Sequence, residues 1–207
     1  KVKDLGEVNT FEESYREYKQ SEKQKSLSEI YWKKLEITDN KIITTNKWLF
    51  NYQYAGIIAK AIPNAKIIHC YRNPLDNILS TYRAHFATGN NFSSSLVDSA
   101  EVYSDQDEIM KTYKKEFKNH IYSLNYDKLV THPSDEIKSL IHWLGWSWND
   151  LYLSPHLNKR KVSTRSNVQV RSPINTKSLG GWKNYKEMLR PAMEIITKKN
   201  KFKDLKY

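Results

Sequence analysis

The chain has 207 residues, enough for one domain with a sizeable core, and its 34 basic and 23 acidic residues give a formal net charge of +11. The single cysteine, Cys70, excludes an internal disulfide framework and favours a reducing compartment, so we expect a cytoplasmic protein. No apolar stretch approaches the roughly 18 residues of a membrane span, and the N-terminal residues lack the apolar centre of a signal peptide.

Strand and helix patterns alternate along the chain. β-branched and apolar runs bounded by turn residues predict strands over 41–45, 67–71 and 121–126. Amphipathic patterns and capping residues predict helices over 10–19, 27–35, 52–62, 100–115, 135–144 and 186–197, with a further helix opening at Pro74. Thr10 followed by Glu13 is typical of a capping box. This alternation predicts an α/β fold, with a parallel sheet covered by helices on both faces.

The segment 66–80 is the most informative part of the chain. A short apolar run, expected to be a buried parallel strand, ends at Arg72, and Pro74 opens a helix in which Asp76 suits the positive end. The unpaired N–H groups of that helix end, together with the guanidinium, form an anion pocket. Ser80 follows on the same helix face. This pattern predicts a phosphate site, although an arginine after a strand is often a plain surface charge.

Two other predicted strand ends carry polar groups. Parallel α/β sheets bind ligands at the carboxyl ends of their strands. Because those ends share one edge of a sheet, three polar segments are expected to converge there: Thr45-Asn46-Lys47, Arg72-Asn73 and Asn125-Tyr126.

These strand ends resemble the sulfotransferase family that uses 3′-phosphoadenosine 5′-phosphosulfate (PAPS), in particular the tetratricopeptide-associated and tyrosylprotein sulfotransferases. The motifs match in order from about Leu5 to Met193. They are Gly6-Glu7, Asn46-Lys47, the pair Arg72 and Ser80, the segments 124–130 and 165–175, and Ser178-Leu179-Gly180-Gly181-Trp182-Lys183-Asn184-Tyr185.

The resemblance implies both a fold and a reaction. It implies a P-loop-nucleotide-hydrolase-like sheet flanked by helices, within a single sulfotransferase-like domain over 1–207 that ends in a basic tail over 198–207. The reaction would carry a sulfuryl group from PAPS to an acceptor hydroxyl, without a metal. Protein tyrosine, saccharide and small-molecule acceptors all remain open, because fold does not choose among them. A tetratricopeptide region upstream in a longer protein is also implied.

The resemblance also assigns roles to individual residues. Glu7 would be the general base, and Lys47 would stabilise charge on the sulfuryl group. Arg72 and Ser80 would bind the 3′-phosphate, while Tyr126 would lie by the adenine. Weaker matches for the cofactor phosphates are Arg171, Lys177 and Lys183.

The chain departs from the family pattern in two places. The Gly-containing loop that holds the 5′-phosphosulfate, with its preceding first strand, should come before Gly6-Glu7, so we expect both to be missing from this chain. Gly180 stands where tyrosylprotein enzymes have a serine that contacts the sulfuryl group, and Ser178 is the expected substitute.

Two other function classes compete with this one. A P-loop kinase needs a Gly-x-x-x-x-Gly-Lys-Ser/Thr loop and a metal-binding aspartate at a strand end, and none of the three strand ends supplies that aspartate. A nucleic-acid-binding module needs a basic stripe with interleaved aromatics, which the sequence does not display. Metal ligands at typical spacing are also lacking.

Overall fold

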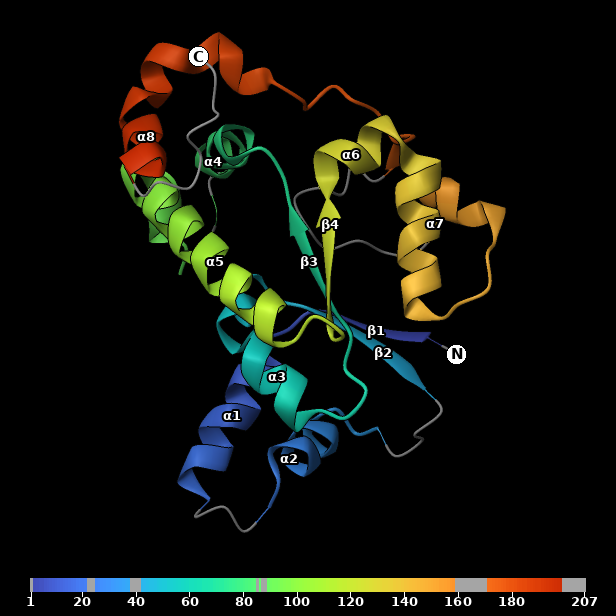
Figure 1. Ribbon diagram of the computed structural model, residues 1–207. Coiled ribbons are helices and arrows are strands. Elements are labelled where there is room, and N and C mark those ends of the chain that lie inside the picture. Colours follow the sequence, from blue (N-terminus) through green and yellow to red (C-terminus); the bar gives the residue numbers. More distant parts are fainter. Residues whose placement is uncertain are drawn as a thin grey trace. The chain divides into compact units, whose positions relative to one another are not determined.

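The computed structural model describes residues 2–21, 25–37, 42–84, 86, 89–158 and 171–198 (Figure 1). Helices and strands alternate along these residues, as the sequence predicts, and the sheets are parallel. The chain divides into two compact units. The first comprises Lys1–Ile67 and Ile109–Tyr122, and the second comprises Ile68–Glu108 and Ser123–Tyr207.

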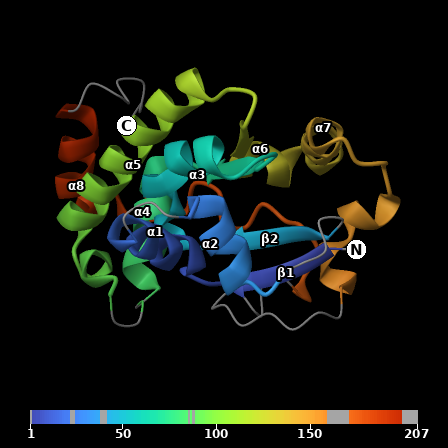
Figure 2. The same cartoon turned by 90° about the horizontal axis from the view of Figure 1, so that it is seen from below.

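In the first unit, β1 (Val2–Glu7) and β2 (Ile43–Lys47) pair in parallel, side by side in the view of Figure 2. The register is irregular between Asp4, which lies opposite Thr45, and Glu7, which lies opposite Lys47. β1 thus contains one more residue than β2 over this stretch, which is a bulge. Gly6 makes the bulge possible, because its φ of 73° is left-handed. The bulge places Glu7 opposite Lys47.

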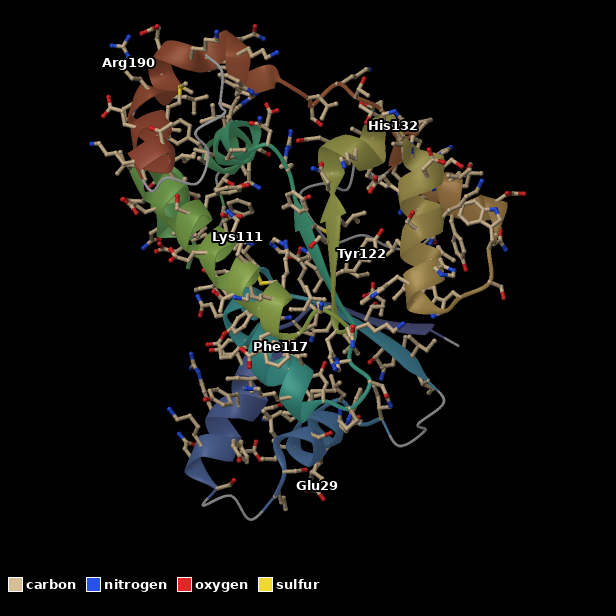
Figure 3. All side chains as sticks on the ribbon, viewed as in Figure 1. Glu29, Lys111, Phe117, Tyr122, His132 and Arg190 are labelled. Carbon is tan, nitrogen blue, oxygen red and sulfur yellow. The ribbon has the colours of Figure 1, made fainter. Side chains whose placement is uncertain are left out.

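Three helices build the core of the first unit: α1 (Thr10–Gln20), α2 (Leu27–Lys34) and α3 (Ala55–Ala61), the last preceded by the 3-10 helix η1 (Leu49–Tyr54). The core between α1 and α2 is largely aromatic, with the rings of Phe11 and Tyr31 edge to face at 5.7 Å. A second cluster includes Ala55, with Phe117 packed against it (Figure 3).

Two strands and five α-helices contribute to the second unit. They are β3 (Ile67–Tyr71), α4 (Pro74–Arg83), α5 (Leu96–Glu116), β4 (Ile121–Asn125), α6 (Tyr126–Thr131), α7 (Pro133–Leu144) and α8 (Lys186–Lys198), where α5 passes into the first unit at Ile109. Short 3-10 helices lie between them: η2 (Asn91–Ser94), η3 (Asp150–Leu153), η4 (Pro155–Leu157) and η7 (Gly181–Tyr185). The core of this unit is formed by residues of α4, α5, α8 and η7, whose helices α4, α5 and α8 are labelled in Figure 1. Its side chains are mostly aliphatic: Leu75, Ile78, Leu79, Ala100, Trp182, Leu189, Ala192, Met193 and Ile196.

Several elements differ from the sequence-based expectation. The strand predicted over 41–45 forms at Ile43–Lys47, with residue 41 outside the described residues, so Lys47 belongs to the strand. The predicted capping box at Thr10 is wrong, because Asn9 is the N-cap of α1 and no side chain caps it. A capping box forms instead at Ser26, before α2. β1 and α6 were not predicted, and Tyr126 begins α6 rather than ending β4.

The expectation that β3 is buried is also wrong. Its side chains alternate, with Ile67 and His69 half-buried and Ile68 and Cys70 exposed. β4 pairs with β3, and packing covers one face of the strand, since Ile67 lies against the Ala55 cluster. An apolar run alone does not distinguish a strand that is covered on one face from one that is covered on both.

Candidate active site

In the first unit, Glu7 and Lys47 meet at the ends of β1 and β2. Their side chains form an ion pair between Glu7 Oε1 and Lys47 Nζ, and they are 41% and 64% exposed. Partial burial lowers the pKa of Lys47, while the adjacent carboxylate favours the charged ammonium. The sequence placed both residues at a candidate site, and the bulge in β1 brings them together.

The polar end of β2 is tied to the segment that follows it. Asn51 Nδ2 donates a hydrogen bond to Asn46 Oδ1 at 2.9 Å, and both residues are half-buried. This bond links η1 to β2 next to Lys47. It therefore limits how far the chain on either side of Lys47 can move.

In the second unit, the Arg72 guanidinium lies in a group that we call the Arg72 cluster: Arg72, Asp76, Tyr126 and Ser178. Arg72 Nη2 donates to the Ser178 carbonyl oxygen at 2.5 Å and lies 3.8 Å from Asp76 Oδ2. Its Cζ lies 5.0 Å from the centroid of the Tyr126 ring, within cation–π range. The Ser178 and Tyr126 hydroxyls share a hydrogen bond of 2.9 Å.

The Arg72 side chain is only 16% exposed. Its Nε is buried and has no hydrogen-bond partner among the described residues. The main-chain oxygen of Arg72 accepts a hydrogen bond of 3.0 Å from the Tyr103 hydroxyl. Burial, reinforced by nearby carboxylates, raises the pKa of Tyr103 well above its usual range, so this hydroxyl stays protonated and donates. The Nε–H group of Arg72 thus has no partner among the described residues, while the bond from Tyr103 holds the main chain of Arg72 in place.

The ends of β3 and β4 turn into helices in the same way. Asn73 Oδ1 accepts from the N–H groups of Leu75 and Asp76 at 3.0 and 3.2 Å, which caps α4. Asn125 caps α6 with the same geometry. Asp127 Oδ2 then accepts the Asn73 N–H at 2.7 Å and links the two turns. The strand–turn–helix unit expected around Arg72 is confirmed.

The remaining predicted site residues lie on the surface of the second unit. Ser80 is exposed on α4, and Lys177 and Lys183 are exposed before and within η7. The Arg171 guanidinium donates to the Asn158 carbonyl oxygen. Residues 165–170 of the matched segment 165–175, and residues 199–207 of the basic tail, lie outside the described residues.

Sequence reasoning missed the contribution of three residues that lie around Arg72: Asp76, Tyr103 and Asp127. Asp76 was interpreted only as a charge that suits a helix N-terminus. Its side chain is 4% exposed, and its hydrogen-bond partners lie more than a hundred residues away in the chain. A local pattern carries no signal of that kind.

Within the part of the chain that the structure describes, no cluster of three or more His, Cys, Asp or Glu side chains could hold a metal ion. In the same residues, no helix is both long enough and apolar enough to cross a membrane.

Comparison with known proteins identifies relatives of this chain. A protein of Aquifex aeolicus without an assigned function is 35% identical over 149 residues, which cover 70% of this chain and 20% of that protein. Protein-tyrosine sulfotransferase 1 of Danio rerio is 27% identical over 145 residues, which cover 66% of this chain and 41% of that protein. The chain thus spans about a fifth and two fifths of the lengths of these relatives.

Two solved structures resemble the fold. The sulfotransferase domain from the curacin biosynthetic pathway superposes with a TM-score of 0.52 at 13% identity, covering 93% of this chain and 77% of that one. Mouse sulfotransferase SULT7A1, complexed with PAP, gives a TM-score of 0.53 at 15% identity, covering 99% of this chain and 84% of that one. These likenesses show the P-loop-like α/β fold of sulfotransferases.

The model of the sulfotransferase family matches residues 6–150, which is more than half of the chain. That segment begins at the bulge next to Glu7 and includes Lys47, Arg72 and Tyr126. The chain belongs to the sulfotransferase family.

Proposed function

We propose that this sulfotransferase uses PAPS as its donor and transfers the sulfuryl group to a hydroxyl of its acceptor, within one domain over residues 1–207. One observation carries the proposal: a largely buried arginine follows β3, directly before a capped helix N-terminus, and keeps an unused Nε donor. Such a guanidinium is suited to a phosphate, because its planar fork matches phosphate oxygens. The bound PAP in a mouse protein of the same fold supports the choice of donor.

The proposal assigns the nucleotide end of the donor to the second unit. Arg72 and Ser80 bind the 3′-phosphate, and the Tyr126 ring lies by the adenine. Arg171, Lys177 and Lys183 add positive charge for the phosphates. The contact between Arg72 and the Ser178 carbonyl is consistent with this role, because an incoming phosphate offers the guanidinium a charged acceptor in place of a neutral one.

The proposal assigns the chemistry to Glu7, Lys47 and Ser178. Glu7 takes the proton of the acceptor hydroxyl while the hydroxyl oxygen forms a bond to the sulfur of PAPS. The bond between sulfur and the 5′-phosphate oxygen breaks, and PAP leaves with that electron pair. The Lys47 ammonium and the Ser178 hydroxyl stabilise the charge that spreads over the sulfuryl and leaving oxygens. No metal takes part in this scheme.

Calorimetric titration of the chain with PAP and with AMP tests the donor assignment. We expect PAP to bind far more tightly than AMP, because only PAP carries the 3′-phosphate. Arg72→Ala should remove that preference, whereas the matched variant Arg190→Ala should keep it, since Arg190 is exposed on α8 and paired with Glu187 (Figure 3). Equal binding of PAP and AMP by the unmodified chain would reject the assignment.

A further inference from the structure

We infer that Asp76 is a positioning residue of the Arg72 cluster: its carboxylate clamps the backbone of residues 180–182, and through it sets the affinity for the 3′-phosphate. The inference rests on the proposed function. Asp76 lies in the first turn of α4, and its side chain is 4% exposed. A buried carboxylate is costly unless its oxygens are hydrogen-bonded or paired. The partners of these oxygens therefore indicate its role.

Both oxygens of Asp76 bind main-chain N–H groups of one turn. Oδ2 accepts from Gly180 at 2.7 Å, and Oδ1 accepts from Trp182 at 3.0 Å. Gly180 has a φ of 66°, and the Lys183 N–H donates back to its carbonyl oxygen at 3.1 Å. The carboxylate thus joins α4 to the start of η7 by two charge-assisted hydrogen bonds.

The clamped turn carries the atoms that contact Arg72. Ser178 precedes Gly180 by two residues, and its carbonyl oxygen accepts the bond from Arg72 Nη2. The Ser178 hydroxyl bonds to that of Tyr126, whose ring lies under the guanidinium. A shift of the turn would therefore move the hydrogen-bond acceptor of Arg72 and a neighbour of Tyr126 together.

The negative charge of Asp76 and its hydrogen bonds to the turn are expected to have opposite effects on the affinity for a phosphate. Its Oδ2 lies 3.8 Å from Arg72 Nη2, so the carboxylate neutralises part of the charge that attracts an anion. If that were its only effect, removal of the negative charge would tighten binding of a phosphate. If the clamp matters more, the same change loosens the turn and weakens binding. The sign of the change distinguishes the two.

Asp76→Asn is the variant of choice, because it keeps the shape of the side chain. The carboxamide offers one acceptor oxygen, and its NH₂ group faces a main-chain N–H that it cannot accept. One of the two clamp bonds is lost. Ile78→Val is the matched control, because Ile78 is a buried residue of the same helix, packs in the core cluster that includes Trp182, and takes no part in the clamp.

The experiment measures PAP and AMP affinities and main-chain hydrogen exchange on the full chain. For Asp76→Asn we expect PAP to bind about tenfold more weakly, AMP to bind nearly unchanged, and the Gly180 and Trp182 amides to exchange faster. Ile78→Val should lower the melting temperature and leave these readouts unchanged. Asp76→Glu, which retains two acceptor oxygens, should recover part of the preference for PAP.

The outcomes separate this inference from the proposed function. If the unmodified chain binds PAP no better than AMP, the proposed function fails, and the inference fails with it. If the unmodified chain prefers PAP but Asp76→Asn binds PAP as well or more tightly, only the positioning role is wrong. Equal loss of PAP affinity in Asp76→Asn and Ile78→Val would also reject it, because general destabilisation would then be the cause.

Discussion

The charged groups of the two units are held in different ways. In the first unit, strand register brings Glu7 and Lys47 opposite each other, and both side chains are more than a third exposed. In the second unit, the Arg72 side chain is 16% exposed and contacts the Ser178 carbonyl, the Asp76 carboxylate and the Tyr126 ring. The Glu7–Lys47 pair therefore depends mainly on the backbone of two strands, whereas the position of Arg72 depends on contacts with several surrounding groups.

In the first unit, the residues assigned to the reaction are expected to contribute little to the stability of the fold. In the second unit, Arg72 is expected to contribute to both ligand binding and stability. Exposed ion pairs contribute about 0–1 kcal/mol, so a change at Glu7 or Lys47 should alter reactivity and leave folding intact. A change at Arg72 leaves the Ser178 carbonyl without its hydrogen bond and the buried Asp76 carboxylate without its cationic neighbour, which costs stability as well as binding. Substitutions in each unit can therefore test the comparison.

The largest expected effect is at Glu7. We expect Glu7→Gln to lower the rate of sulfuryl transfer by roughly 10²–10⁴-fold, the usual contribution of a general base. The melting temperature and the affinity for PAP should not change. The rate is measured with labelled PAPS and a panel of hydroxyl acceptors that includes tyrosine peptides and saccharides.

Glu17→Gln is the matched control for this prediction. Glu17 is also exposed in the first unit and is paired with a lysine, Lys34, at 3.0 Å. This variant should transfer sulfuryl groups at the unmodified rate. Full activity of Glu7→Gln would remove Glu7 as the base.

The second effect concerns Arg72. We expect Arg72→Lys to weaken PAP binding about 10–100-fold, because an ammonium cannot reproduce the planar fork of the guanidinium. Unlike Glu7→Gln, this variant should also melt at a lower temperature, since the Ser178 carbonyl loses its donor. Arg190→Lys, on the exposed face of α8, should change neither quantity. Unchanged melting of Arg72→Lys would show that the Arg72 cluster is no more integrated than the Glu7–Lys47 pair.

A third effect tests packing in the first unit, away from the charged pair. A Cβ at Gly56 on α3 would lie 2.6 Å from Tyr113 Cε1 of α5, a contact too close for either group. We therefore expect Gly56→Ala to lower the free energy of unfolding by about 1–3 kcal/mol, although alanine favours helices. Chemical denaturation of the unmodified chain and of Gly56→Ala measures this difference in the free energy of unfolding. A stabilised variant would mean that Tyr113 moves aside without cost.

The sequence predicted best what depends on neighbouring residues. The bounds of β3 and the start of α4 were correct, because Pro74 determines where the helix opens and Asn73 supplies its cap. β2 was placed two residues too early, because its position depends on pairing with β1. β1 has the polar sequence VKDLGE, which displays no strand pattern.

The same division applies to the candidate site. Arg72 was predicted to bind an anion because it stands between a strand and a helix, and the structure confirms that position in the chain. The role of Asp76 was not visible, because its partners Gly180 and Trp182 are 104 and 106 residues away. The Asp76 carboxylate is buried because the turn at residues 180–182 packs against it. Sequence patterns describe residues that are close in the chain, so they do not predict this contact.

The smallest expected effect is at the capping box of α2, where a single exposed carboxylate contributes through local bonds. Glu29 Oε2 accepts from the Ser26 N–H at 2.7 Å and from the Ser26 hydroxyl at 2.8 Å (Figure 3 labels Glu29). These bonds, the main-chain one above all, lower the pKa of Glu29 below its ordinary value. Folding is thus favoured by the ionised form.

The sign of the pH dependence follows from this. The stabilisation is fully present above the ordinary glutamate pKa and is lost as the pH falls through the lowered pKa of the folded state. The difference in unfolding free energy between the unmodified chain and Glu29→Gln should therefore be constant near neutral pH and shrink in acid. Glu13→Gln is the control, because α1 has no side-chain cap hydrogen bond and this substitution removes no capping bond. A difference that grows in acid would contradict the prediction, because the carboxylate would then stabilise α2 in its protonated form.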